Sequence, residues 1–138
     1  MRSIYIIGSM RNPRILEVAK ALRTIEWNVY EDWHSTGPES DVYWQAYEKA
    51  RGRTYREALA GYHAQEGFLL DKRHLDRCDA TVLVMPAGKS AHLELGYMIG
   101  RGKPGYILMD GEPETYDVMH NFATAIFGSL DEMLTVLR

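Results

Sequence analysis

Short apolar runs alternate with amphipathic segments along the chain. The run Ser3–Gly8 is apolar, rich in isoleucine and ended by glycine, which is typical of a strand buried on both faces. The run Asp79–Pro86 has the same character and is the clearest strand. Shorter strands are predicted at Trp27–Tyr30, Tyr106–Met109 and Ala123–Phe127. The pattern therefore predicts five strands.

The segments between these runs have helical spacing. Apolar positions from Ile15 to Leu22 predict a helix, and Pro13 suits its first turn. From Asp41 to Leu70 the sequence predicts one or two helices, broken near Gly52. Further helices are predicted at 90–100, 115–120 and 129–137. Ser129 and Glu132 match a capping box at the start of the last one.

Strands that alternate with helices need crossover connections, which place the strands in parallel and the helices on both faces of the sheet. The sequence thus predicts one α/β domain over residues 1–138, a Rossmann-like (flavodoxin-like) three-layer sandwich with a mostly parallel five-stranded sheet. Ligands of such sheets bind at the carboxyl ends of the strands. The loops after Gly8 and after Met85 are therefore the first candidates for a site.

Composition and charge narrow the classes of function. The 138 residues are 46% hydrophobic and 25% charged, as expected of one packed domain. A net charge of -3 disfavours binding to polymeric nucleic acid. The single Cys78 excludes an internal disulfide, no zinc-ligand spacing occurs, and no cofactor is expected. Without an apolar run near a bilayer span of about 20 residues or a signal-peptide pattern, we expect a cytoplasmic protein that binds no membrane.

The loop after the first strand joins a buried strand to a helix N-terminus. Such a position favours an anion, and Arg11 can add a bidentate contact. Gly8, Ser9 and Arg11 are therefore candidates for binding a phosphate. The alternative is an ordinary turn with a solvated arginine. The loop is not a Walker motif and lacks the three glycines of a dinucleotide fingerprint, which weakens NAD binding of the Rossmann type.

The loop after Met85 also enters a helix. Its candidates for contact with a phosphate or ribose are Gly88, Lys89 and Ser90. Glu94 lies one helical turn after this loop and therefore on the same face. Its neighbours are apolar, and we expect Gly96 and Gly100 to let the helix approach the sheet closely, which would bury the carboxylate. The alternative is an exposed helix glutamate.

Two aspartates bracket a short amphipathic segment. Asp79 opens a strand and is expected to be structural. Asp71 is placed in the loop before a short helix, where it either caps that helix or serves chemistry. The five histidines share no spacing and are interpreted as structural. The aromatic residues between 27 and 62 either fill the core or form a wall on which a heterocyclic base stacks.

Three separated segments together resemble the nucleoside 2-deoxyribosyltransferases and the related 2′-deoxynucleoside 5′-phosphate N-hydrolases. Tyr5–Arg11 resembles the family's first strand and phosphate loop, Asp71–Asp79 its catalytic-aspartate segment, and His92–Tyr97 its nucleophile helix. The spacing agrees as well, because Tyr5 lies three residues before the loop glycine and Asp71 eight residues before Asp79.

The resemblance implies a set of roles. Glu94 is the nucleophile that attacks C1′, Asp71 the acid that protonates the departing base, and Tyr5 the residue that holds Glu94. The first loop binds a 5′-phosphate, helped by Lys89 or Ser90. The choice between these two residues stays open because the loop before Glu94 is one residue longer than in the mammalian N-hydrolases. A dimer or larger homo-oligomer is implied, with residues near Asn121 completing a neighbour's site.

Hydrolysis of a nucleoside 5′-monophosphate is the favoured function, because Arg11 and Lys89 offer positive charge for a phosphate. The alternatives are deoxyribosyl transfer between bases, a catalytically silent nucleotide-binding module and, more remotely, cleavage of NAD at its nicotinamide ribosyl bond. The sequence leaves open which base is released and whether the sugar is ribose or deoxyribose.

Overall fold

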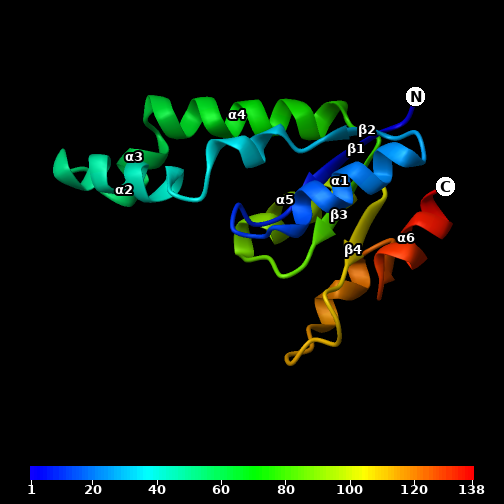
Figure 1. The fold of residues 1–138 in the computed structure, drawn as a ribbon. Helices are drawn as coiled ribbons and strands as arrows, with labels where there is room; N and C mark the ends of the chain where they lie inside the picture. The colour runs from blue at the N-terminus through cyan, green and yellow to red at the C-terminus, as the bar shows by residue number, and fades with distance from the viewer.

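The computed structural model describes residues 1–138, which form an α/β fold around one parallel sheet (Figure 1). The strands are β1 (Ser3–Ile7), β2 (Asn28–Tyr30), β3 (Ala80–Val84), β4 (Gly105–Leu108) and β5 (Ala125–Phe127). Their order is β2-β1-β3-β4-β5, and every neighbouring pair is parallel. This is the flavodoxin-like order, whose direction of winding reverses between β1 and β3. The predicted fold class is confirmed.

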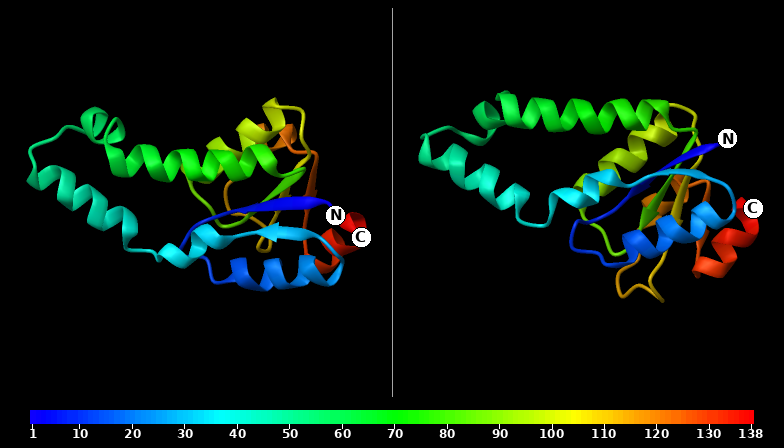
Figure 2. Two further views of the ribbon diagram at one scale, coloured as in Figure 1. Left: turned by 90° about the horizontal axis from the view of Figure 1, so that it is seen from above. Right: turned by 45° about the horizontal axis from the view of Figure 1, so that its top comes forward.

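Helices cover both faces of the sheet. They are α1 (Arg14–Thr24), α2 (Ser40–Ala50), α3 (Tyr55–Leu59), α4 (Tyr62–Arg77), α5 (Lys89–Gly100) and α6 (Leu130–Leu137), with 3₁₀ helices at Asp32–Thr36 and Val118–Phe122. Helices α1 and α6 pack on one face, whereas α5 and the C-terminal part of α4 pack on the other (Figure 2). None of these helices combines the length and apolar character needed to cross a bilayer.

The two-residue period of the strands divides the core between these faces. Ile4 and Ile6 of β1 lie in the cluster that includes α1 and α6, while Tyr5 and Ile7 lie in the cluster that includes α4 and α5. All four residues are at most 2% exposed. The alternation therefore directs the Tyr5 side chain toward the layer that holds α5.

Helices α2 and α3 and the first half of α4, residues 40–69, extend beyond the sheet, and we call this segment the helical arm (Figure 2). The break near Gly52 is confirmed, but the arm contains three helices, and α3 begins with an unpredicted capping box between Thr54 and Glu57. Four tyrosines of the arm are exposed, namely Tyr43, Tyr47, Tyr55 and Tyr62. These aromatic rings do not fill the core of the domain.

Two predictions near the C-terminus are wrong in part. The helix expected at 115–120 is only the 3₁₀ helix Val118–Phe122. The capping box at α6 is half formed: Ser129 Oγ accepts a hydrogen bond from Glu132 N at 3.1 Å, but the Glu132 carboxylate accepts from Gly128 N at 2.9 Å. The helix is still capped, because each bond satisfies a free backbone N–H group.

Candidate functional site

A cleft of about 460 Å³ lies at the carboxyl ends of β1 and β3. It is lined by Tyr5, Gly8, Ser9, Met10, Arg11, Trp33, Asp41, Asp71, Gly88, Lys89, Ser90, Ala91 and Glu94. Nine of the ten candidate residues are in this set, although they come from three distant parts of the sequence. The exception is Asn121. The cleft occupies the topological switch point at which ligands of this architecture bind.

Hydrogen bonds from Asn12 and Arg14 connect the start of α1 to the end of β3 and the residue after it. The buried Asn12 side chain donates to the carbonyl oxygens of Val84 and Met85 at 3.4 and 3.3 Å. Its Oδ1 accepts from the backbone N–H of Arg14 at 2.9 Å, and the Arg14 side chain donates to Met85 O at 3.0 Å. These contacts hold the segments after β1 and β3 together, and the sequence alone gave no sign of them.

Two turns supply backbone N–H groups and positive charge to the cleft. A Cβ at Gly8 would lie 2.6 Å from Ile15 Cδ1, so a larger residue there would have to displace the Ile15 side chain of α1. Arg11 is exposed and donates to the carbonyl oxygen of Pro38 at 3.1 Å. Lys89 opens α5, whose first N–H groups lack a side-chain cap. The turn before α5 therefore suits an anion, and at the turn before α1 the exposed Arg11 supplies a positive charge.

Glu94 lies in the cleft with a largely buried carboxyl group. Its Oε2 has no hydrogen-bond partner. Burial, reinforced by the charge of Asp71, raises the pKa of Glu94 to about 7, although a hydrogen bond with Tyr5 acts in the opposite direction. Glu94 is therefore not the solvated helix glutamate of the alternative interpretation. A buried acid with a raised pKa in a cleft is a common feature of functional sites.

The expected reason for this burial was wrong. A Cβ at Gly96 or Gly100 would meet no atom within 4 Å, so these glycines do not bring α5 close to the sheet. The close approach occurs instead at Gly105 of β4, where a Cβ would lie 2.7 Å from Ile99 Cγ1 and 2.9 Å from Leu95 Cδ1. Helix α5 packs close to the sheet because strand β4 has no side chain at Gly105.

Asp71 faces Glu94 from another helix. It lies within α4 rather than in a loop, so the prediction of a helix-capping position is wrong. Burial raises the pKa of the Asp71 carboxyl, and the nearby His74 partly offsets this effect. Asp79, by contrast, is structural as expected, since it accepts a hydrogen bond from Ser3 N at 2.8 Å. The cleft thus holds two carboxyl groups that both retain protons more strongly than usual.

An aromatic stack supports the acidic pair. The ring centroids of Tyr5 and Tyr30 are 5.1 Å apart, and those of Tyr30 and His74 are 3.7 Å apart with nearly parallel planes. Burial and the charge of Glu94 raise the pKa of the Tyr5 phenol, which therefore stays protonated and can donate. Tyr30 contacts the same helix turn that carries Asp71.

Trp33 is the one aromatic residue of the predicted wall, residues 27–62, that lines the cleft. Its Nε1 donates to Ile6 O at 2.8 Å, which fixes the indole beside the end of β1. Met10, Asp41 and Ala91 also line the cleft and were not predicted. Trp33 comes from the connection between β2 and the helical arm, and Asp41 comes from the first turn of α2 at the start of the arm, so both reach the cleft through tertiary packing.

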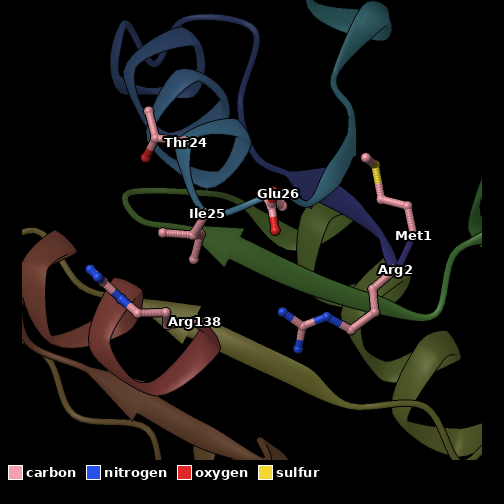
Figure 3. Close-up of a pocket in the computed structure, with 6 residues that line it drawn as sticks. All are labelled: Met1, Arg2, Thr24, Ile25, Glu26 and Arg138. Carbon is pink, nitrogen blue, oxygen red and sulfur yellow. The ribbon is translucent and has the colours of Figure 1, made fainter.

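Two other depressions lack comparable chemistry. One of about 690 Å³, at the amino ends of the strands, is lined by Met1, Arg2, Thr24, Ile25, Glu26 and Arg138 (Figure 3). Arg2 is used structurally there, since it stacks on Trp27 and donates to Leu137 O at 3.0 Å. The other, of about 570 Å³, is mainly apolar and lies beside the 3₁₀ helix that carries Asn121. The Asn121 side chain is exposed and donates to Val118 O at 3.0 Å.

Comparisons with known proteins bear on the fold. No protein-family model matches the chain, and no curated protein sequence does. Among solved structures, the CMP N-glycosidase BcmB of Clostridium botulinum matches with a TM-score of 0.59 and 16% identity, over 99% of this chain and 98% of that chain. A 2-deoxyribosyltransferase of the psychrotolerant bacterium Bacillus psychrosaccharolyticus matches with a TM-score of 0.66 and 18% identity, over 98% and 95%. The chain therefore shares its fold with both enzymes along nearly its whole length.

Proposed function

We propose that this protein hydrolyses the N-glycosidic bond of a nucleoside 5′-monophosphate, releasing free base and (deoxy)ribose 5-phosphate. The observation that carries the proposal is the buried Glu94 carboxyl, placed near Asp71 and Tyr5 in a cleft that is also lined by the two turns carrying Arg11 and Lys89. A carboxyl pair supplies both groups that this reaction needs, a nucleophile and an acid.

In the first step, the Glu94 carboxylate attacks C1′ and the C1′–N bond breaks. The electron pair of that bond passes to the base, which takes a proton from Asp71. In the second step, Asp71 removes a proton from water, and the resulting oxygen attacks C1′ and displaces Glu94. Atoms and charge balance over the two steps, with water as the only co-substrate.

The protonation of the pair fits this sequence of steps. The charge of Asp71 helps to raise the pKa of Glu94 to about 7, so the two carboxyl groups are coupled and share the last proton of the pair. The pair is productive when that proton is on Asp71 and Glu94 is ionised. The hydrogen bond from Tyr5 favours this arrangement, because it stabilises the charged form of Glu94.

The phosphate preference rests on the two turns. Gly8 and Ser9 lie in the turn before α1, while Gly88, Lys89 and Ser90 lead into α5, whose first backbone N–H groups have no side-chain cap. Arg11 and Lys89 add two positive charges. A bare nucleoside would leave these charges without a partner, and we therefore assign this region to the 5′-phosphate.

The two proteins of shared fold support chemistry at an N-glycosidic bond, since one is a CMP N-glycosidase and the other a 2-deoxyribosyltransferase. Deoxyribosyl transfer, in which a second base replaces water, is the runner-up function. A homo-oligomer in which Asn121 contributes to a neighbouring cleft agrees with the exposed position of Asn121 outside its own cleft.

The test is a panel of nucleosides and their 5′-monophosphates, with free base measured by chromatography. We expect base release from at least one monophosphate, much slower release from its nucleoside, and none from Glu94→Gln. Release that requires an added second base would assign transfer instead of hydrolysis. Tight binding of a nucleotide without any release of base would indicate a catalytically silent nucleotide-binding module. Release of nicotinamide from NAD would indicate cleavage of the nicotinamide ribosyl bond instead.

A further inference from the structure

Helix α4 is attached to the sheet only through its C-terminal turns. Leu75 is its only fully buried residue, and its first half belongs to the helical arm (Figure 2). Asp71 lies about one turn before Leu75, the buried residue through which α4 packs on the sheet. Its position relative to Glu94 on α5 therefore depends on the contacts made by the residues that follow it.

A polar cluster joins α4 to α5 at those turns. The Tyr97 hydroxyl donates to Asp76 Oδ1, while Lys72 Nζ lies 2.9 Å from Asp76 Oδ2. Lys72 and Arg101 each lie 5.6 Å from the centroid of the Tyr97 ring. The hydrogen bond from Tyr97 lowers the pKa of Asp76, so this carboxyl is ionised at neutral pH. Lys103 Nζ also donates to the carbonyl oxygen of Asp76 at 2.7 Å.

The cluster lies a short distance along each helix from the carboxyl pair. Tyr97 lies three residues after Glu94 on α5, a rise of about 4.5 Å, and Asp76 lies five residues after Asp71 on α4, a rise of about 7.5 Å. The bond thus ties the two helices about one turn from the carboxyl groups they carry. Sliding of one helix along the other would stretch the bond and change the separation of the carboxyl groups.

We propose that Tyr97 and Asp76 are positioning residues, whose hydrogen bond sets the separation between the helices that carry the acid and the nucleophile. This inference rests on the proposed function. Neither residue lines the cleft, so neither touches substrate. Retaining glycosidases need their carboxyl groups about 5 Å apart. A misplacement of about 1 Å costs on the order of 100-fold in rate, so the bond should affect turnover more than binding.

Tyr97→Phe removes the hydroxyl but keeps the ring between Lys72 and Arg101. We expect kcat on the best monophosphate to fall about 10- to 100-fold with little change in KM. Asp76→Asn should lower kcat in the same way. The kcat of the double variant should be no lower than that of the less active single variant, because both substitutions remove the same hydrogen bond. The matched control is Tyr116→Phe, which removes another phenol–carboxylate hydrogen bond, to Glu112 at 2.8 Å, on an exposed loop.

A second measurement does not depend on activity. The ¹³C chemical shift of the Glu94 carboxyl, followed against pH, reports the nearby charge of Asp71. In Tyr97→Phe the pKa of Glu94 should shift from its value of about 7, because its separation from the charge of Asp71 changes, and in Tyr116→Phe it should not change. A wild-type protein that releases no base would refute the proposed function but leave this titration valid. Lower thermal stability with an unchanged kcat and an unchanged Glu94 pKa would overturn the positioning role.

Discussion

Asp71 of helix α4 and Glu94 of helix α5 line one cleft, and the charge of Asp71 raises the pKa of Glu94. The two residues are far apart in sequence and are brought together by the packing of two helices on the same face of the sheet. Electrostatic coupling of this kind separates the protonation states of two chemically similar groups. It gives the pair measurable properties that do not depend on the identity of the base.

The pH dependence of the reaction should report this coupling. On a sugar 5-phosphate that carries 4-nitrophenol in place of the base, no acid is needed, so kcat/KM should rise with pH as Glu94 ionises, with a midpoint near its pKa of about 7. In Asp71→Asn the midpoint should move to lower pH, because the charge that raises the Glu94 pKa is gone. Identical midpoints in stopped assays of both proteins would mean that the two carboxyl groups do not interact.

Glu94 should also make the protein less stable at high pH. The folded state keeps the Glu94 proton up to about pH 7, whereas the unfolded chain releases it at the ordinary value of 4.5. The free energy of unfolding therefore falls as pH rises through this window. Glu94→Gln should be more stable than wild type above pH 7 by on the order of 3 kcal/mol, with no difference below the ordinary glutamate pKa.

Urea unfolding at several pH values measures this difference. Glu66→Gln, at an exposed position of α4, is the control and should change the stability little at any pH. A Glu94→Gln variant with the same stability as wild type at every pH would show that the carboxyl is well solvated.

Arg11 should discriminate between phosphorylated and bare substrates. Arg11→Ala removes a charge-assisted contact worth roughly 1.5 to 3 kcal/mol, so kcat/KM on the monophosphate should fall about 10- to 100-fold, while that on the nucleoside changes little. The exposed Arg56 of the helical arm provides the control substitution Arg56→Ala. Equal losses on both substrates would make Arg11 a structural residue that only holds the Pro38 carbonyl.

The loss of activity in Asp71→Asn should depend on the leaving group of the substrate. Protonation matters most for a poor leaving group, so the variant should be severely impaired on a natural monophosphate and much less impaired on the 4-nitrophenyl substrate. Because Asp71 lies inside α4 and caps no helix, its loss should not lower thermal stability. An equal fractional loss on both substrates, measured side by side, would remove Asp71 from the role of acid.

The sequence predicted the sheet well because its strands are short apolar runs that end in turn formers, and such runs have few alternatives. The prediction from sequence placed Asp71 in a loop, because an aspartate that follows three apolar residues is typical of the end of a helix. In the structure, α4 includes Asp71 and ends only at Arg77. Trp33 and Asp41 could not be assigned to the cleft, because the 3₁₀ helix and the start of α2 that carry them reach it only through tertiary packing. The close approach at Gly105 likewise depends on a neighbouring helix that no local pattern identifies.

A covalent glycosyl–enzyme intermediate on Glu94 is the central claim of the mechanism, and intact-protein mass spectrometry tests it directly. Asp71→Asn should react with the 4-nitrophenyl substrate but resolve the intermediate slowly, because no base activates water. We predict that rapidly quenched samples gain the mass of one sugar phosphate and that peptide mapping places it on Glu94. Release of nitrophenol without an adduct, or an adduct on another residue, would contradict the account.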